Sequence, residues 1–591
     1  MHTPDGAIRI GPARAVGWSA LLALVVFAGS LGNGFAYDDE PIIENNPVVT
    51  EARWADAAFG PYWQVEEGYG LLYRPVALLA YAAEWQIGGG RPVLFHLVNL
   101  VLHAAVSVLL ALLVLRLARI RPQSALLARR ADLAALVAGG IFAVHPVHVE
   151  AVANGVGQGE LWAAFGVLGA IHLYIGSPGR IWQRSLRLVG IGGCYALALG
   201  AKEIAVTLPA LLLLVDSVGR GWVPATARVR RERLVFLLLL VVFVTYLALR
   251  WMALGSLVGE ETAMALDGAS TTTRVATALS VVPVVVTLLL FPLRLAADYD
   301  PGVLELAHPT DPAVLMGGSL LLGAAVIILA FWRRAPLVGY GVAWTLIVWS
   351  VVSNLFFTTG VLLAERTLYL PSVGVAMALG VGAAALAEWK GTRPALVVVA
   401  LAVVLLSART VTRVPVWFST FTVMEDLART TPDSWRSDRA RAAGLLRIGE
   451  HEEAFAWFDS ALAKAPRKYD LLTEYGAALK EARRLEPARE LLERAIRLSP
   501  RRRAAWQLLA ELHLIAGRMR EAHRVAMEGV RFSGNDAELW RIASEAYLGA
   551  GFLPAAVRAR RMALLLEPGD AANEARLEEI LAVMGEAGES G

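Results

Sequence analysis

Two observations predict an all-α protein in two parts, a polytopic bundle of membrane helices followed by a helical solenoid. The first is composition: of 591 residues, 56% are hydrophobic and only 18% are charged, whereas a soluble domain carries about 25% charged residues. The second is a change near residue 411, where the long apolar segments end and a regular repeat begins. The net charge of +3 is too small to favour binding to nucleic acid.

Eleven apolar segments are long enough to span a membrane as helices, which takes about 17–25 residues each. They are residues 16–35, 92–115, 132–149, 160–176, 186–201, 203–217, 234–252, 313–331, 336–357, 367–387 and 394–411. Residues 275–292 are also apolar, but Pro283 interrupts them, and we expect a re-entrant or interfacial helix there. The first segment has some features of a cleaved signal peptide, but its length and the many spans after it favour a retained helix.

Clusters of arginine and lysine between the apolar segments predict the orientation, because short cytoplasmic loops are enriched in these residues. They place the N-terminus in the cytoplasm, and the polar motifs around Asp38, His145, Lys202, Asp298 and Arg366 then face the opposite side. The clusters are Arg116, Arg119, Arg121, Arg129, Arg130, Arg180, Arg184, Arg187, Arg228, Arg230, Arg231, Arg233, Arg333, Arg334, Lys390 and Arg393. The Ala-, Arg- and Gly-rich composition suggests a bacterium with a GC-rich genome. The predicted location is therefore a bacterial inner membrane with a periplasmic outer face.

An internal repeat of 34 residues follows the membrane part. The repeated positions are Pro432, Pro466, Pro500, Gly534 and Pro568, and in a second series Ala454, Ala488, Ala522 and Ala556. A helix-turn-helix unit of this length, with small residues at fixed positions, is the signature of tetratricopeptide repeats. The predicted domains are residues 1–413 in the membrane and residues 432–580 as a solenoid. Such solenoids present a concave binding surface, and an odd number of spans would place this one in the periplasm.

The sequence Tyr37-Asp38-Asp39-Glu40 follows the first span directly. Ionised groups at a membrane boundary need solvation or a chemical use, so this acidic turn is either a solvated loop or part of a reactive centre. His96, Asn99 and His103 share one face of the second span, and we expect them to line a cavity. The guanidinium of Arg366 either pairs with Glu365 or contacts a phosphate, whose oxygens match its fork of donors.

The sequence contains no clear metal or nucleotide motif. His145-Pro146-Val147-His148 is not the HExxH pattern, which needs one uninterrupted helix, and we expect Pro146 to end or kink its helix. Gly380 and Gly382 are expected only to permit close approach of helices. Cys194 is the only cysteine, so an intrachain disulfide is excluded. We predict no metal site, although a divalent cation that joins the carboxylates stays an open alternative.

Six motifs in this order resemble the transmembrane O-mannosyltransferases with tetratricopeptide repeats, members of the GT-C glycosyltransferase superfamily. The motifs are Tyr37-Asp38-Asp39, Tyr73-Arg74-Pro75, Phe95-His96-Leu97-Val98-Asn99, His145-Pro146-Val147-His148-Val149-Glu150-Ala151-Val152, Lys202-Glu203 and Glu365-Arg366-Thr367-Leu368-Tyr369-Leu370-Pro371-Ser372. The resemblance implies a GT-C-like bundle, a polyprenyl-phosphate sugar donor and catalysis by Asp38 and Asp39. The chain departs from the family at Gln158, where relatives often have arginine.

The predicted function is transfer of a sugar, with mannose suggested by the resemblance, from polyprenyl phosphate to a protein hydroxyl on the non-cytoplasmic face. One carboxylate of Asp38 and Asp39 would act as general base in a single displacement. The predicted contacts to the donor phosphate or substrate are Arg74, His96, His145, His148, Glu150, Lys202, Glu365, Arg366 and Tyr369. The predicted partners are the lipid donor, a protein acceptor held by the repeats, and the membrane. The alternative is a non-catalytic scaffold whose repeats recruit periplasmic proteins; a transporter is disfavoured, because the membrane segments show no internal repeat.

Overall fold

The computed structural model describes residues 11–63, 72–120, 125–176, 181–220, 232–257, 266, 268–299, 304–332 and 335–589. The regular structure of these residues is entirely helical, as predicted. The chain forms two compact units, the first ending at Thr431 and the second beginning at Pro432. Among the basic residues that predict the orientation, Arg121, Arg180, Arg228, Arg230, Arg231, Arg333 and Arg334 lie outside the described residues.

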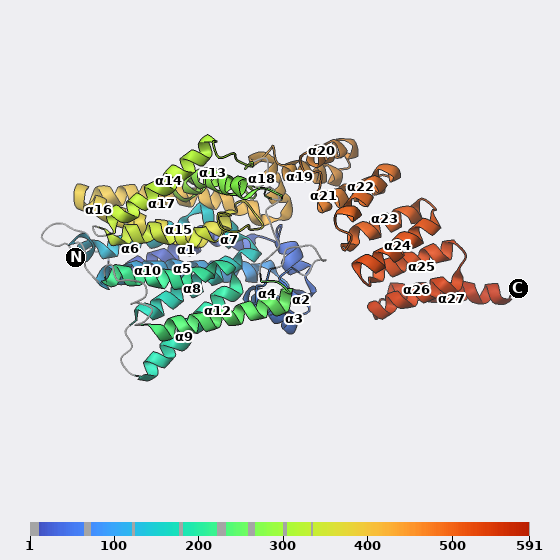
Figure 1. The fold of residues 1–591 in the computed structure, drawn as a ribbon, viewed down its shortest axis with the longest axis horizontal. Helices are drawn as coiled ribbons and strands as arrows, with labels where there is room; N and C mark the ends of the chain where they lie inside the picture. Colours follow the sequence, from blue (N-terminus) through green and yellow to red (C-terminus); the bar gives the residue numbers. More distant parts are fainter. Residues whose placement is uncertain are drawn as a thin grey trace. The chain divides into compact units, whose positions relative to one another are not determined.

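The first unit is a helix bundle, with short helices gathered at one of its ends (Figure 1). Its helices are α1 (Pro12–Phe27), η1 (Ala28–Gly32), η2 (Glu40–Glu44), α2 (Pro47–Thr50), α3 (Trp54–Phe59), α4 (Pro75–Gly88), α5 (Pro92–Ile120), α6 (Ala125–Val144), η3 (Pro146–His148), α7 (Val149–Ala153), η4 (Gly155–Gly157), α8 (Gln158–Ile175), α9 (Ile181–Ala201), η5 (Glu203–Thr207), α10 (Leu208–Arg220), α12 (Arg233–Leu254), α13 (Thr271–Leu290), α14 (Pro312–Phe331), α15 (Pro336–Ser350), η7 (Glu365–Leu368), α16 (Tyr369–Lys390), α17 (Thr392–Arg413), η8 (Val414–Phe418) and α18 (Thr420–Thr430).

Seven helices among the described residues are long and apolar enough to cross a membrane, or eight if one bent pair is a single span. The predicted eleven spans are therefore not reproduced. Helices do form at the other predicted positions, but α10 and α15 have only 13 and 15 residues, and α8 and α9 carry polar or charged side chains in their first two turns. Conversely, α13 has 20 residues and qualifies as a full crossing, although Pro283 predicted an interfacial helix. Since the count is odd with seven spans and even with eight, the orientation stays a prediction.

The bent pair confirms the expected effect of Pro146. Residues 129–144 and 146–153 form two helical segments that meet at an angle of 49°. Proline removes a backbone donor and clashes with the preceding turn, so a continuous helix is unfavourable there. The bend brings His145, His148 and Glu150 to the region where α6 ends and α16 begins.

The second unit consists of paired helices with the predicted period. They are α19 (Trp435–Arg447), α20 (His451–Lys464), α21 (Tyr469–Glu481), α22 (Leu485–Leu498), α23 (Arg503–Ile515), α24 (Met519–Ser533), α25 (Ala537–Gly549), α26 (Leu553–Leu566) and α27 (Ala571–Glu589). The repeated alanines Ala454, Ala488, Ala522 and Ala556 are all fully buried, because the two helices of each pair pack closely at these positions. Tetratricopeptide repeats are thus confirmed by the period and by the burial of the small residues.

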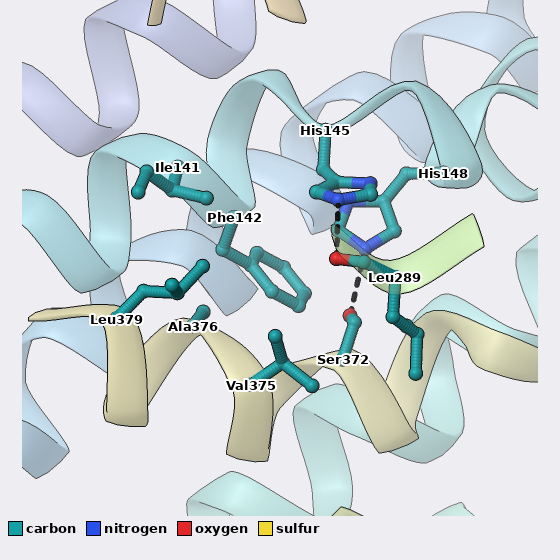
Figure 2. A pocket seen from close by; sticks show the side chains of 9 residues that line it. All are labelled: Ile141, Phe142, His145, His148, Leu289, Ser372, Val375, Ala376 and Leu379. Atoms are coloured by element: carbon teal, nitrogen blue, oxygen red, sulfur yellow. Dashed lines mark hydrogen bonds between the residues drawn. The ribbon is translucent and has the colours of Figure 1, made fainter. Parts of the chain in front are cut away.

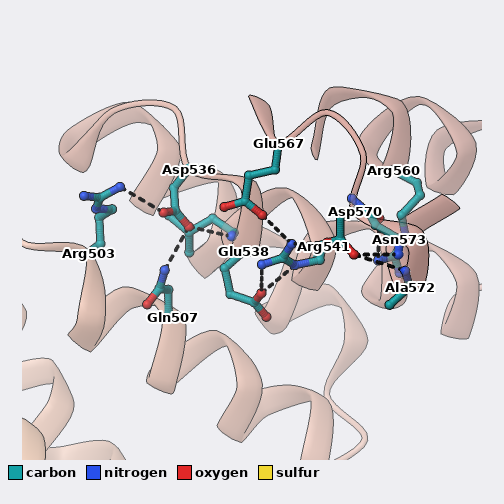
Figure 3. Close-up of polar contacts among 11 residues, drawn as sticks. Arg503, Gln507, Asp536, Glu538, Arg541, Arg560, Glu567, Asp570, Ala572 and Asn573 are labelled. Carbon is teal, nitrogen blue, oxygen red and sulfur yellow. Dashed lines mark hydrogen bonds and ion pairs between the residues drawn. The ribbon is translucent and has the colours of Figure 1, made fainter. Parts of the chain in front are cut away.

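Polar contacts join successive repeats of this solenoid (Figure 3). Asp536 accepts a hydrogen bond from the backbone N–H of Leu539 at 2.9 Å and thereby caps α25, and it also pairs with Arg503 of the preceding repeat at 3.2 Å. Arg541 in turn lies 3.0 Å from Asp570, which precedes α27. Each repeat therefore stabilises the start of the next, as nearest-neighbour stacking requires.

Close helix packing in the membrane unit depends on glycine at one of the two positions noted in α16. A Cβ atom added at Gly380 would lie 2.3 Å from the backbone oxygen of Ala134 in α6, whereas one added at Gly382 meets no atom within 4 Å. The expected role in close approach is thus confirmed for Gly380, and Gly382 has open space.

We therefore expect Gly380→Ala to destabilise the membrane unit and Gly382→Ala to leave it unchanged or slightly more stable. The added methyl group at Gly380 must push α16 away from α6, and overpacking of this kind costs about 1–3 kcal/mol. Thermal unfolding of both variants in detergent, followed by size-exclusion fluorescence, would measure the difference. Equal unfolding temperatures for the two variants would contradict the close contact.

Candidate active site

The acidic turn after α1 is anchored by Asp39. Its fully buried carboxylate accepts hydrogen bonds from the backbone N–H groups of Ala36 (3.2 Å), Gly155 (3.0 Å) and Val156 (2.8 Å). Burial raises the pKa of Asp39 to about 7, and the three N–H donors oppose that rise. Asp39 thus ties the acidic turn to the loop that begins α8, and it has little surface left for a substrate.

Asp38 lies on the other side of the turn, because Tyr37 adopts a left-handed backbone conformation with a φ of 57°. The Asp38 side chain is 21% exposed and lies 3.0 Å from Nη1 of Arg366. The same nitrogen lies 3.0 Å from Oε1 of Glu150, and the backbone N–H of Arg366 donates to Oε2 of Glu150 at 2.8 Å. One guanidinium therefore joins two carboxylates from distant parts of the chain.

Two further ion pairs surround this group. Arg74, at the start of α4, makes three hydrogen bonds to Glu203 with a shortest distance of 2.9 Å, and Lys202 lies 2.5 Å from Glu160. Glu160 also attracts both Arg74 and Arg366 electrostatically. Burial lowers the pKa of Lys202, and the nearby charge of Glu160 opposes that effect. The structure thus brings together Asp38, Glu150, Arg74, Lys202 and Arg366, and we call these five residues the charged cluster.

Glu365 faces away from the charged cluster although Arg366 belongs to it. Its Oε1 accepts hydrogen bonds from the backbone N–H of Ala296 (2.7 Å) and from the hydroxyl of Tyr299 (2.8 Å). Adjacent residues in the short helix η7 therefore connect two regions, the charged cluster on one side and the loop after α13 on the other.

The predicted histidines are buried between helices and bond to their neighbours. Nε2 of His96 lies 3.2 Å from the carbonyl of Gly34, and Nε2 of His145 donates to the carbonyl of Leu289 at 3.2 Å. Nε2 of His148 lies 2.8 Å from the hydroxyl of Ser372 (Figure 2). Because a carbonyl only accepts, Nε2 of His103 donates to Ala143 and Nδ1 accepts from Tyr369 at 2.8 Å. These side chains fill the core beside the charged cluster.

His96, Asn99 and His103 were expected to line a cavity. Instead, all three side chains are fully buried against their neighbours. The side-chain amide of Asn99 donates to the carbonyl groups of Val152 and Asn154, so it orders the loop that Asp39 also binds. Among the described residues, no group of three or more His, Cys, Asp or Glu side chains is arranged to hold a metal ion.

Glu160, Glu203 and Glu84 were missed as candidate residues. Glu203 follows Lys202 in one of the six motifs, and Glu160 lies two residues after Gln158. Glu84 is a buried carboxyl in α4 that accepts from the amide of Gln158 at 3.1 Å, and Trp162 donates to the same amide. Gln158 stands where relatives often have arginine, so a neutral partner faces Glu84, and burial raises the pKa of Glu84 to about 8.

Sequence comparisons agree with this arrangement of motifs. Protein O-mannosyl-transferase TMTC4 of Mus musculus is 27% identical over 455 residues, which cover 68% of this chain and 60% of that protein. Protein O-mannosyl-transferase TMTC2 of Mus musculus is 32% identical over 208 residues, covering 34% and 23%. The chain is a distant homologue of the protein O-mannosyltransferases. It spans less than two thirds of the length of these relatives.

The other comparisons add little to that homology. No protein-family model matches the chain. A tetratricopeptide-repeat protein of Thermus thermophilus is 21% identical and matches 30% of this chain and 95% of its own, with a TM-score of 0.24. That score is too low to show a shared fold. The repeat architecture of this O-mannosyltransferase homologue therefore rests on its own helix pairs.

Asp39→Asn is expected to destabilise the protein more than Asp38→Asn. An asparagine has one acceptor oxygen, so its amide group must face at least one of three buried N–H donors. An unsatisfied buried donor costs about 1–3 kcal/mol, whereas a partly exposed ion pair such as that of Asp38 contributes about 0–1 kcal/mol. Thermal unfolding of the two variants at pH 7 would test this, and a larger loss in Asp38→Asn would contradict it.

Glu84→Gln is expected to weaken the pH dependence of stability. The pKa of Glu84 is raised by burial to about 8 from its ordinary value of 4.5, so the folded state binds a proton more tightly than the unfolded state. Stability from this group is present below pH 4.5 and is lost as pH rises towards 8. Unfolding temperatures between pH 5 and 8 should fall less steeply for Glu84→Gln than for the parent. Glu51→Gln, at an exposed carboxylate, is the matched control and should keep the parental slope.

Proposed function

We propose that this chain is a membrane glycosyltransferase that moves a sugar, mannose in the first instance, from polyprenyl phosphate to a hydroxyl of a protein acceptor. The observation that supports this most is the charged cluster. It combines a partly exposed carboxylate with three cations at the end of a membrane helix bundle. The distant homology to protein O-mannosyltransferases favours glycosyl transfer over the scaffold alternative.

Asp38 is the proposed general base. Its side chain is partly exposed and one of its oxygens bonds to Arg366, so the carboxylate retains acceptor capacity for an incoming hydroxyl. Asp39 is assigned a positioning role, because its oxygens already accept three backbone hydrogen bonds. In the single displacement, the acceptor oxygen attacks the anomeric carbon while the bond to phosphate breaks. The hydroxyl proton passes to Asp38.

Arg366, Lys202 and Arg74 are the proposed contacts to the phosphate. The donor is a phosphodiester with one negative charge, and the leaving phosphate gains a second one as the bond breaks. Cations already in place stabilise that developing charge without reorganisation. Glu150, Glu160 and Glu203 hold these cations in the absence of substrate, which keeps ionised groups paired at the membrane boundary.

The tetratricopeptide repeats are proposed to bind the protein acceptor, since solenoids of this kind present extended binding surfaces. The proposed orientation puts both the charged cluster and the repeats in the periplasm of a bacterial inner membrane. His96, His145, His148 and Tyr369 are proposed to hold in place the helices that carry the charged cluster. Glu365 is proposed to anchor η7 on the side that faces away from this cluster.

Asp38→Asn is expected to lower the transfer rate about 10²–10⁴-fold, which is the usual contribution of a general base. The assay would use purified protein in nanodiscs, radiolabelled polyprenyl-phosphate mannose and periplasmic extract as acceptor. Asp56→Asn is the matched control, because Asp56 is an exposed carboxylate in the same loop region and should leave the rate unchanged. A folded Asp38→Asn variant with the parental rate would overturn the enzymatic proposal and favour a scaffold.

A further inference from the structure

The chain before the acidic turn lies against a segment near the end of the first unit. This segment is η8, which leads into α18, the last helix of that unit. The backbone N–H of Gly34 donates to the carbonyl of Phe418 in η8 at 2.9 Å. The side-chain amide of Asn33 lies 3.5 Å from the carbonyl of Val414, at the other end of η8. The two segments are therefore held together just before the acidic turn begins.

The hydroxyl of Thr420, in the first turn of α18, binds the acidic turn at both of its ends. Its Oγ1 accepts a hydrogen bond from the backbone N–H of Tyr37 at 2.7 Å, and it donates its proton to Oε1 of Glu40. Asp38 and Asp39 lie between these two contacts in the sequence. A hydroxyl has one proton to donate and lone pairs to accept, so both roles of Thr420 are filled by the turn. We call these two hydrogen bonds the Thr420 clamp.

The backbone conformation of Tyr37 explains why the turn needs such a contact. Its φ is 57°, and residues with a side chain rarely adopt this left-handed conformation. Such a conformation persists where the surrounding structure holds it in place. The Thr420 clamp binds the N–H group of this residue, and the next residue is Asp38. The clamp therefore acts on the backbone that directs Asp38 towards Arg366.

The start of α18 is capped by the neighbours of Thr420. Oγ of Ser419 accepts from the backbone N–H of Thr422 at 3.3 Å, and Oγ1 of Thr422 accepts from the backbone N–H of Ser419 at 3.0 Å. This reciprocal pair is a capping box. Val423 and Leu427 are fully buried and pack α18 into the core. Neither the cap nor this packing uses the hydroxyl of Thr420, so its two hydrogen bonds serve the acidic turn.

The helix α18 is also connected to the other member of the ion pair between Asp38 and Arg366. Asp426 in α18 lies 2.5 Å from the buried guanidinium of Arg413. Arg413 in turn is attracted by the charge of Glu365, the residue before Arg366. The same helix therefore contacts the chain beside the carboxylate directly and reaches the chain beside the guanidinium through one arginine.

We propose that Thr420 is a positioning residue for the proposed base. Its hydroxyl holds the acidic turn in the conformation that presents Asp38 to Arg366, and α18 is thus part of the frame of the active site. The catalytic consequence rests on the proposed function, whereas the clamp itself is a property of the folded chain. Without the hydroxyl, the N–H group of Tyr37 loses its partner and Asp38 is held less firmly. A displacement of about 1 Å in a reacting group can lower a rate about 100-fold.

Removal of the hydroxyl tests the catalytic consequence in the nanodisc transfer assay. Thr420→Val should lower kcat about 10- to 100-fold and leave KM for the donor nearly unchanged, because Arg74 and Lys202 still bind the phosphate. Thr420→Ala is the smaller substitute should the valine variant fail to fold. Thr420→Ser restores the hydroxyl and should retain most of the parental rate. Thr430→Val is the matched control in α18, since the exposed hydroxyl of Thr430 bonds within its own helix, and it should leave kcat unchanged.

A double variant separates positioning of the base from a general effect on the fold. If Thr420 acts through Asp38, Thr420→Val should lower the transfer rate no further in the Asp38→Asn background. A multiplicative loss in that background would show that Thr420 acts independently of Asp38 and would overturn the proposal. A parental kcat in folded Thr420→Val and Thr420→Ala would also overturn it.

Hydrogen exchange, measured by mass spectrometry in the same nanodiscs, tests the clamp without a transfer assay. The amide of Tyr37 should exchange about fivefold faster in Thr420→Val, which is the factor that one lost hydrogen bond supplies. It should exchange as in the parent in Thr420→Ser and Thr430→Val. Parental exchange in Thr420→Val would overturn the clamp.

The results distinguish a failure of this inference from a failure of the proposed function. A parental transfer rate in Asp38→Asn overturns the enzymatic proposal and the positioning role together. Loss of transfer in Asp38→Asn with a parental rate in Thr420→Val overturns the positioning role alone.

Discussion

The carboxylate of Asp39 holds together two segments on which the candidate site depends. The acidic turn follows α1, and the loop that receives its hydrogen bonds begins α8, 116 and 117 residues later. Asn33 and Asn99 bind the neighbouring carbonyl groups of the same loop. With Asp39 committed to this contact and Tyr37 in a left-handed conformation, the turn presents Asp38 to Arg366. The contacts of Asp39 therefore fix the position of Asp38.

Charge balance at the membrane boundary explains the rest of the charged cluster. Each cation is paired with a carboxylate from another helix, as in Arg74 with Glu203 and Lys202 with Glu160. Buried ion pairs contribute little net stability, but removing one partner leaves an expensive unpaired charge. A site built this way stays ordered without substrate and exchanges its internal carboxylates for a phosphate when one arrives.

Local patterns in the sequence predicted local structure well. The 34-residue period predicted the helix pairs, since the buried alanines must recur wherever two helices pack closely. Pro146 predicted a bend, and the bend is present at 49°. Span counting was less successful, because mean hydropathy does not separate a short buried helix such as α15 from a crossing. Pro283 lies inside a continuous helix of 20 residues, so proline alone did not define an interfacial segment.

The sequence by itself determined the two-part organisation, the phase of the repeats and the candidate residues, because all three depend on spacing along one segment. Only the tertiary structure decided which partners each of those residues contacts. Asp38 and Asp39 are adjacent and chemically identical, yet one faces a guanidinium 328 residues away and the other three backbone N–H groups. His96 and His103 likewise prove to fill the core. Partners that distant leave no trace in local spacing, since they meet only when the helices pack.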